Sequence, residues 1–168
     1  NYEVIFVDVN KELIEQINLL KGYKVRSIGL NSSEEVFVEN INGLFLGDNE
    51  SINKKLSQAD LITTSVGPKF VEDIFNLVIN TKTEKIQTFI AFENMYRASS
   101  SNSNDSNQNK LVLIDAVVDK IVPPQNTTSL NVTVEEYGSI VLDESMRTKP
   151  FNESEVVSYR NYEHEFYK

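Results

Sequence analysis

The residues whose chemistry deserves first consideration stand at the ends of short apolar runs of the chain. Four such runs, at residues 2–8, 61–64, 86–92 and 111–118, are typical of buried strands. The candidate residues at or after their ends are Asp8, Ser65, Val66, Gly67, Glu93, Asn94 and Asp119. Because ligands of parallel α/β sheets bind beyond the carboxyl ends of the strands, we expect these residues to converge along one rim.

Asp8 is a candidate for holding a ribose. In dinucleotide-binding folds an acid at a strand end accepts hydrogen bonds from the adenosine ribose and favours NAD over NADP. Such an acid stands about 20 residues after a glycine-rich phosphate loop, whereas only seven residues precede Asp8. We therefore expect that loop and its strand to lie upstream of Asn1. On Asp8 alone the plainer interpretation is favoured, in which an Asp-Val-Asn triplet ends a strand and starts a helix.

The turn at residues 65–68 follows a predicted strand and opens a predicted helix. Its glycine lets the backbone approach a ligand, and the helix start offers free N–H groups and a positive dipole end. The alternative is an ordinary turn. Glu93 and Asn94 could hold a ribose or polarise a carbonyl, or simply end their strand. A buried acid at Asp115 or Asp119 would need a functional or structural partner.

The first half of the chain predicts a strand, a helix and a group of short strands. Asn10 is placed to cap a helix that Gly22 ends. Residues 23–46 then predict strands or a hairpin. A short helix capped by Ser51 follows.

The second half returns to strand and helix. Pro68 stands at the first position of a helix with a clean apolar face. The Ser/Asn tract at 99–109 predicts a loop that buries no core. Residues 130–143 predict a terminal pair of strands joined by a tight turn, and residues from 151 onward predict a helix. The fold class is therefore α/β and Rossmann-like, with a largely parallel sheet, helices on both faces, and a missing first strand and glycine-rich loop.

The composition excludes several kinds of site. The chain has no cysteine and a single histidine, His164, so we expect no metal site. Its net charge of −9 argues against nucleic acid as a partner. No apolar run approaches the roughly 20 residues that span a bilayer, and no signal segment opens the sequence. We expect a cytoplasmic protein with no membrane partner.

Taken together and in this order, the segments resemble the mannitol-1-phosphate 5-dehydrogenase family of long-chain polyol dehydrogenases. The matching segments are VIFVDVN (4–10), ADLITTSVGP (59–68), IAFENMYR (90–97) and IDAVVDKIVPP (114–124), with LNVTVEEY (130–137) matching more loosely. The similarity covers nearly the whole chain. It implies an incomplete NAD-binding domain at 1–150 and the start of a helical substrate domain at 151–168.

The resemblance also implies a reaction and a role for each candidate. NAD would accept hydride from a polyol phosphate, giving fructose 6-phosphate without a metal. The implied roles are Asp8 on the adenosine ribose, Val66 and Gly67 against the cofactor, Glu93 and Asn94 beside the nicotinamide and the reacting oxygen, and Asp119 near the active-site base.

The family's base is a lysine, and Lys168 falls close to its expected place, counting from VTVE. Its amine would take the alcohol proton while Asn94 stabilises the oxyanion. The alternative is a terminal lysine with no such role. Glu165 would share a helix face with Lys168 and tune it, or be simply solvated.

Two interpretations of the whole chain stay open. In the first, it is a piece of a polyol-phosphate dehydrogenase that is inactive alone, with a hexuronate reductase or unphosphorylated mannitol dehydrogenase as the nearest alternative. In the second, it is a non-catalytic module that keeps the scaffold for binding or assembly. A missing central strand would leave strand edges unpaired, so we expect a rearranged sheet or self-association through the gap. Without a phosphate loop we expect an NAD affinity no better than about millimolar.

Overall fold

The computed structural model describes residues 3–102, 110–125 and 129–143, together with the backbone of 156–159. The chain forms two compact units, each made from two stretches of sequence. Unit 1 comprises Asn1–Ile52 and Lys120–Gly138, and unit 2 comprises Asn53–Asp119 and Ser139–Lys168. Five of the seven strand pairings are parallel in the described chain, which confirms the predicted largely parallel α/β architecture.

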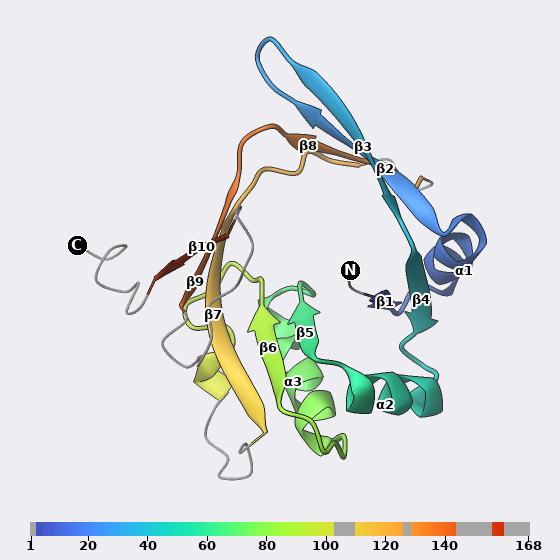
Figure 1. The fold of residues 1–168 in the computed structure, drawn as a ribbon, viewed down its shortest axis with the longest axis vertical. Helices are drawn as coiled ribbons and strands as arrows, with labels where there is room; N and C mark the ends of the chain where they lie inside the picture. The colour runs from blue at the N-terminus through green and yellow to red at the C-terminus, as the bar shows by residue number, and fades with distance from the viewer. Residues whose placement is uncertain (1–2, 103–109, 126–128, 144–155, 160–168) are drawn as a thin grey trace. The chain divides into compact units, whose positions relative to one another are not determined.

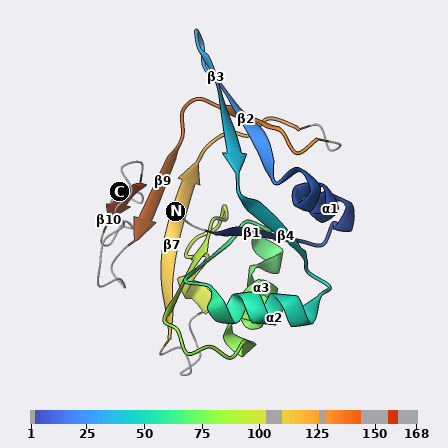
Figure 2. The same cartoon turned by 45° about the vertical axis from the view of Figure 1, so that its right-hand side comes forward.

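Unit 1 begins with a strand and a capped helix, as predicted. β1 (Val4–Asp8) leads into α1 (Lys11–Leu20), which Figure 2 shows beside β1 and β4. The side-chain oxygen of Asn10 accepts a hydrogen bond from the N–H of Leu13 at 3.1 Å, so Asn10 caps the helix. Ile14 and Ile17 form the buried face of α1.

The end of α1 differs from the prediction that Gly22 terminates it. Lys21 takes the left-handed conformation, with φ 55°, and its N–H donates to the carbonyl of Ile17 at 2.9 Å. The Lys21 ammonium also donates to the side-chain oxygen of Asn42 at 2.6 Å, which helps to hold this turn. Gly22 instead begins the next strand, where a Cβ would lie 2.6 Å from the ring of Phe37.

The strands predicted within 23–46 are present and form a hairpin and a separate pair. β2 (Gly22–Ile28) and β3 (Ser33–Glu39) are antiparallel, while β4 (Ile41–Phe45) runs parallel to β1. β8 (Val132–Glu135) adds a parallel strand to β2. The prediction that β8 pairs with the following strand is wrong, because β9 (Ser139–Asp143) belongs to unit 2 and pairs with β7.

The pair β1–β4 has one edge closed and one open. The carboxamide of Asn18 donates to the carbonyl of Gly43 and accepts from its N–H, each at 2.9 Å, and so closes the outer edge of β4. In the described part of the chain β1 pairs only with β4, and Val4, Phe6 and Val7 are exposed. β5 in unit 2 likewise pairs only with β6. The expected unpaired edges are therefore present, and the strands are divided into three sheets.

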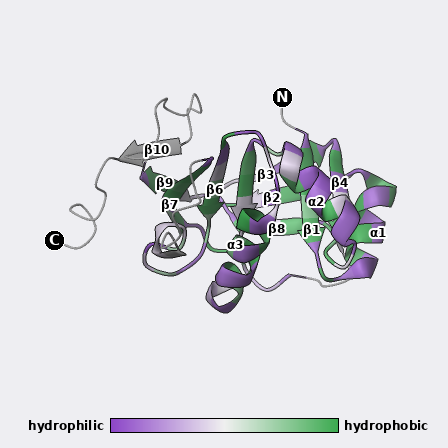
Figure 3. Ribbon diagram, turned by 90° about the horizontal axis from the view of Figure 1, so that it is seen from below, coloured by the Kyte–Doolittle hydropathy of each residue, from purple (hydrophilic) through white to green (hydrophobic). Residues whose placement is uncertain are grey.

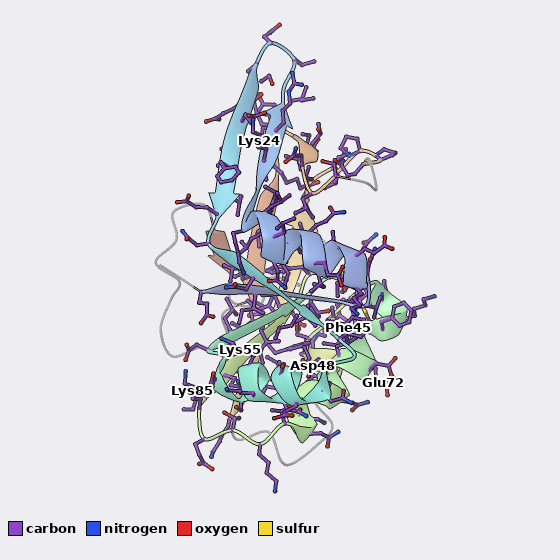
Figure 4. The ribbon with its side chains drawn as sticks, turned by 90° about the vertical axis from the view of Figure 1, so that its right-hand side faces the viewer. Lys24, Phe45, Asp48, Lys55, Glu72 and Lys85 are labelled. Carbon is purple, nitrogen blue, oxygen red and sulfur yellow. The ribbon has the colours of Figure 1, made fainter. Side chains whose placement is uncertain are left out.

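α2 (Asn49–Gln58) is capped by Asp48 and not by Ser51. Figure 4 labels Asp48 at the start of this helix. The Asp48 carboxylate accepts from the N–H of Ser51 at 3.1 Å. Hydrogen bonds from the Ser51 side chain and backbone lower the pKa of Asp48. At the other end, the buried amide of Gln87 donates to the carbonyls of Leu56 and Ala59 at 2.6 and 2.8 Å.

Unit 2 is a largely parallel sheet with α3 packed against it (Figure 1). β5 (Leu61–Thr64), β6 (Gln87–Ala91) and β7 (Leu111–Asp119) run parallel, and β9 joins β7 antiparallel. A short 3-10 turn, η1 (Pro68–Phe70), starts at the predicted proline and leads into α3 (Val71–Asn80). Figure 3 shows hydrophobic residues along β6, β7 and β9.

The core between α3 and the sheet is aromatic and aliphatic. Phe89 of β6 and Phe75 of α3 meet edge to face, with ring centroids 5.6 Å apart. Val71 and Val78 bury the same face of α3. β5 is less buried than predicted, since only Ile62 and Thr64 of its four residues lie inside.

The helix predicted from residue 151 is wrong at Val156–Tyr159, which form β10, a strand parallel to β9. The other residues of 151–168 lie outside the described part of the chain. None of the helices in the described residues is both long and apolar enough to cross a membrane.

Candidate functional site

The carboxyl ends of β5 and β6 are joined by the side chain of Glu93. Its carboxylate accepts the N–H of Val66 at 2.5 Å and the N–H of Gly67 at 3.2 and 3.1 Å to its two oxygens. The backbone adds a further link, since the N–H of Phe92 donates to the carbonyl of Thr64 at 2.8 Å. Three predicted site residues from two separate loops are thus brought together at one end of the unit 2 sheet.

Gly67 sits in a backbone conformation that requires glycine. Its φ is 90° and its ψ is 144°, a region that residues with a Cβ rarely adopt. A Cβ built at Gly67 would have no heavy atom within 4 Å, so the space beside this residue is open. The sequence predicts close backbone approach to a ligand here, and the open space fits that prediction.

The N–H groups expected to be free at this turn are not free. Those of Val66 and Gly67 are both engaged by the Glu93 carboxylate. A carboxylate at the start of a helix is stabilised by the free N–H groups and the dipole. The turn after β5 therefore already holds an anion, and it is the protein's own.

Asn94 is exposed and lies in a loop whose two ends are fixed. At the front end stands Glu93, whose carbonyl accepts the N–H of Met95 at 2.8 Å. At the far end stands Ser99, which is fully buried at 0% exposure and whose hydroxyl accepts the N–H of Ala91 at 2.8 Å. The prediction that the tract from residue 99 buries no core is wrong at Ser99.

The partner that a buried acid in β7 needs is supplied by the same loop. Asp115 is 7% exposed, and one of its oxygens accepts the N–H groups of Ser99 and Ser100 at 3.0 and 2.9 Å. Its other oxygen accepts the hydroxyl of Ser100 at 2.5 Å. Asp115 is thus a structural acid that anchors the loop carrying Asn94. Asp119, at the end of the same strand, is exposed.

Thr64 is a site residue that sequence reasoning missed. It ends β5 directly before Ser65, is 5% exposed, and its hydroxyl oxygen has no hydrogen-bond partner among the described residues. An unpaired buried hydroxyl is costly. The signal that could have found it is the TTSVGP segment itself, which places a second polar residue at the strand end.

Asp8 belongs to unit 1 and is half-buried at the end of β1. One of its carboxylate oxygens accepts the N–H of Asn10 at 2.7 Å, so the residue does start the helical turn, as the plainer interpretation held. This contact engages one of the two carboxylate oxygens. Since Gly67 and Asn94 lie in unit 2, the single rim that would unite them with Asp8 stays a prediction.

Glu165 and Lys168 lie outside the described residues, so the predicted base and its neighbour stay predictions. Within the described ranges no cluster of three or more His, Cys, Asp or Glu side chains is placed to hold a metal ion. The chemistry available in unit 2 is that of a strand-end loop with an exposed amide, a carboxylate and a glycine beside open space.

Comparison with known proteins shows which family the chain matches. The family model described as the mannitol dehydrogenase Rossmann domain matches residues 1–153. A mannitol-1-phosphate 5-dehydrogenase of Mycoplasmopsis pulmonis is 31% identical over 144 residues, which cover 86% of this chain and 39% of the relative. One of Lactococcus lactis subsp. cremoris is 32% identical over 171 residues, covering 89% and 44%. The chain thus spans less than half the length of these curated relatives.

Two solved structures share the fold. A D-sorbitol dehydrogenase in substrate-free form matches with a TM-score of 0.75 at 12% identity, covering 96% of this chain and 48% of that chain. The Pseudomonas fluorescens mannitol 2-dehydrogenase in complex with NAD and D-mannitol matches with a TM-score of 0.73 at 11% identity, covering 96% and 47%. These likenesses show that the Rossmann-like fold expected from the sequence is correct.

Proposed function

We propose, from the premise that this chain belongs to the mannitol dehydrogenase Rossmann domain family, that it forms the NAD-binding half of a polyol-phosphate dehydrogenase. The reaction is hydride transfer between NAD and mannitol 1-phosphate, which yields fructose 6-phosphate. The observation that carries the proposal is the family match over residues 1–153. The curated relatives that share about 30% of its residues are mannitol-1-phosphate 5-dehydrogenases, which supports the phosphorylated substrate.

In this proposal the site residues divide between the two nucleotides of NAD. Doubly wound folds bind one nucleotide with each half. Asp8, with one oxygen not engaged by Asn10, would accept hydrogen bonds from the adenosine ribose. The β5–α3–β6 unit would take the nicotinamide half, with Val66 and Gly67 lining it and Glu93 beside it. The open space at Gly67 supports this placement.

Asn94 would act at the substrate end of the cofactor. Its exposed amide would donate to the reacting oxygen and stabilise the developing oxyanion. Lys168 would take the alcohol proton as general base, with Glu165 and Asp119 near it. In this proposal residues 1–150 form the nucleotide-binding domain and 151–168 begin the substrate domain.

On their own the 168 residues would bind NAD weakly, at about millimolar or worse, and would not turn over. Glu93 engages the N–H groups of Val66 and Gly67, so this turn offers the pyrophosphate no free donor from these two residues. The open edges of β1 and β5 would favour self-association of the isolated chain. We place the enzyme in the cytoplasm, where NAD and sugar phosphates are held.

The test is an assay of the complete protein with NAD and mannitol 1-phosphate, and in reverse with NADH and fructose 6-phosphate. We expect Asn94→Ala to lower kcat by about a hundredfold, as loss of an oxyanion donor does. Asn76→Ala, on the exposed face of α3, is the matched control and should leave kcat unchanged. Unphosphorylated mannitol and a hexuronate complete the panel. Binding of NAD without turnover of any substrate would favour a non-catalytic module instead.

A further inference from the structure

The turn after β5 presents a negative charge to any ligand beside it. The half-buried carboxylate of Glu93 occupies the position at which the N–H groups of Val66 and Gly67 would otherwise hold a ligand anion. A phosphate at this position would have to displace Glu93 or lie against it. The geometry therefore disfavours an anionic ligand group here and favours a neutral or cationic one.

The described hydrogen bonds to Glu93 all come from backbone N–H groups, which carry no net charge. The nearest basic residue along the chain from this turn, Lys69, directs its ammonium over the ring of Phe70, 4.6 Å from the centroid. The charge of Glu93 is thus stabilised by dipoles and is not cancelled by an ion pair with that lysine. It remains available to act on a ligand.

The open space and the carboxylate lie on either side of the same residue, Gly67, and are not in direct contact. Gly67 both donates to Glu93 and borders open space, since a Cβ at this residue would meet nothing within 4 Å. A flat group that approaches the Gly67 backbone therefore comes close to the Glu93 oxygens. Such an interaction is stronger in a partly water-excluded site than in bulk water.

We propose that Glu93 makes this site selective for the oxidised form of the cofactor. The inference rests on the proposed function, in which unit 2 takes the nicotinamide half. The oxidised ring carries one positive charge. When bound, it would accept a hydride from the alcohol carbon and become neutral, while the hydroxyl proton would leave to a base and the alcohol would become a ketone. The Glu93 carboxylate would stabilise the cationic ring before the transfer and would give no such stabilisation to the neutral ring after it.

The size of the effect follows from Coulomb's law. A full charge about 6–8 Å away, at an effective dielectric constant of about 40, changes a dissociation constant by roughly six- to tenfold. The quantity to follow is the dissociation constant for NADH divided by that for NAD⁺. Loosening of the loop would weaken the binding of NAD⁺ and of NADH alike, so its effect cancels in this ratio. Removal of the charge would weaken mainly the binding of NAD⁺, so its effect remains in the ratio.

The experiment titrates the complete protein separately with NAD⁺ and with NADH by calorimetry. Glu93→Gln should lower this ratio roughly six- to tenfold, mainly by weakening the binding of NAD⁺. Glu93→Asp keeps the charge and should leave the ratio near that of the unmodified protein. Glu72→Gln removes an exposed carboxylate from the first turn of α3, and this matched control should not move the ratio.

The outcomes separate this inference from the proposed function. A protein that binds neither cofactor form overturns both. If the protein binds both forms, and Glu93→Gln leaves the ratio of the two dissociation constants unchanged, only the selectivity assigned to Glu93 is overturned. If Glu93→Gln does not fold, Val66→Lys provides the test, because it adds a positive charge at an exposed position and keeps the backbone N–H that Glu93 accepts. A ratio that Val66→Lys leaves unchanged also overturns the proposal.

Discussion

Replacement of Asp115 tests whether a buried acid anchors the loop that carries Asn94. Asp115 lies inside β7, and its three hydrogen bonds come from Ser99 and Ser100 at the far end of that loop. Asp115→Ala removes the acceptor of two backbone N–H groups, one of them in a fully buried residue. We expect this variant to unfold more easily, with the loop losing its anchor first.

The magnitude follows from the number of groups left without a partner. Each buried N–H that loses its acceptor costs about 1–3 kcal/mol, while the Ser100 hydroxyl can turn toward water. Removal of a buried charge returns part of this cost. We expect Asp115→Ala to lower the free energy of unfolding by about 2–4 kcal/mol. Asp115→Asn should cost only about 1 kcal/mol, because its amide oxygen can still accept both N–H groups and its NH₂ can donate to Ser100.

The assay is urea unfolding of the 168-residue chain, followed by far-ultraviolet circular dichroism. For a slope of about 2 kcal/mol per molar urea, the Asp115→Ala midpoint should fall by about 1–2 M. Asp119→Ala, at the exposed end of the same strand, is the matched control and should change the free energy of unfolding by less than about 0.5 kcal/mol. The reasoning is refuted if Asp115→Ala behaves like this control, or if Asp115→Asn is as unstable as Asp115→Ala.

Three further predictions concern the turn, the core and alkaline pH. Gly67→Ala should lower the free energy of unfolding by about 1–3 kcal/mol. The loss would come from backbone strain alone, because φ at Gly67 is 90° and an added Cβ would meet no other atom within 4 Å. Urea unfolding that shows no loss of stability would contradict this. Phe75→Ala and Phe89→Ala should each lower the free energy of unfolding by about 3–5 kcal/mol. A double-mutant cycle should give a coupling energy of about 0.5–1.5 kcal/mol between the two rings. Strictly additive effects would argue against the edge-to-face contact. Burial raises the pKa of Tyr23 above its ordinary value of 10.0, so the stability due to the neutral phenol is present below about pH 10 and is lost as the pH rises through the folded pKa. Thermal unfolding of Tyr23→Phe between pH 9 and 11 should show less of this alkaline loss than the unmodified chain, and an equal loss would exclude Tyr23 as its source.

The helices and strands of the first half were largely predictable because their signals are local. Asn10 caps α1 as its position predicts, and Pro68 opens the turn before α3. The errors concern helix ends, where a residue near the predicted one ends or caps the helix instead. Lys21 ends α1 in place of the glycine that follows, because it takes the left-handed conformation itself and donates its N–H to the carbonyl of Ile17. Asp48 caps α2 in place of Ser51, because the helix already starts at Asn49 and the Asp48 carboxylate accepts the N–H of Ser51 itself.

Strand pairing was less predictable, because it depends on partners far apart in the chain. β8 and β9 are adjacent in sequence with Gly138 between them, a pattern that favours a hairpin. They join different sheets instead, β8 beside β2 and β9 beside β7. No local signal near Gly138 distinguishes these outcomes. The register of each strand is set by apolar contacts within its own unit.

The candidate site was predictable in its members and not in their contacts. Glu93, Val66 and Gly67 stand at strand ends, which a single sequence reveals. Their hydrogen bonds join residues 26 and 27 positions apart, which it does not. Ser99 illustrates the same limit, because a serine at the start of a polar tract predicts a loop, and only the buried acid of β7 gives it a place in the core.

Two carboxylates hold the loop of Asn94 in different ways, and the difference bears on its function. Glu93 holds the front end from the loop itself and remains half-exposed, whereas Asp115 holds the far end from a neighbouring strand and is buried. Both accept mainly backbone N–H groups, so the loop is fixed through its main chain. This leaves the exposed amide of Asn94 available to a ligand without a competing role in holding the loop. A substitution of Asn94 should then alter chemistry with little change in stability, while one of Asp115 should alter stability first and chemistry only through it.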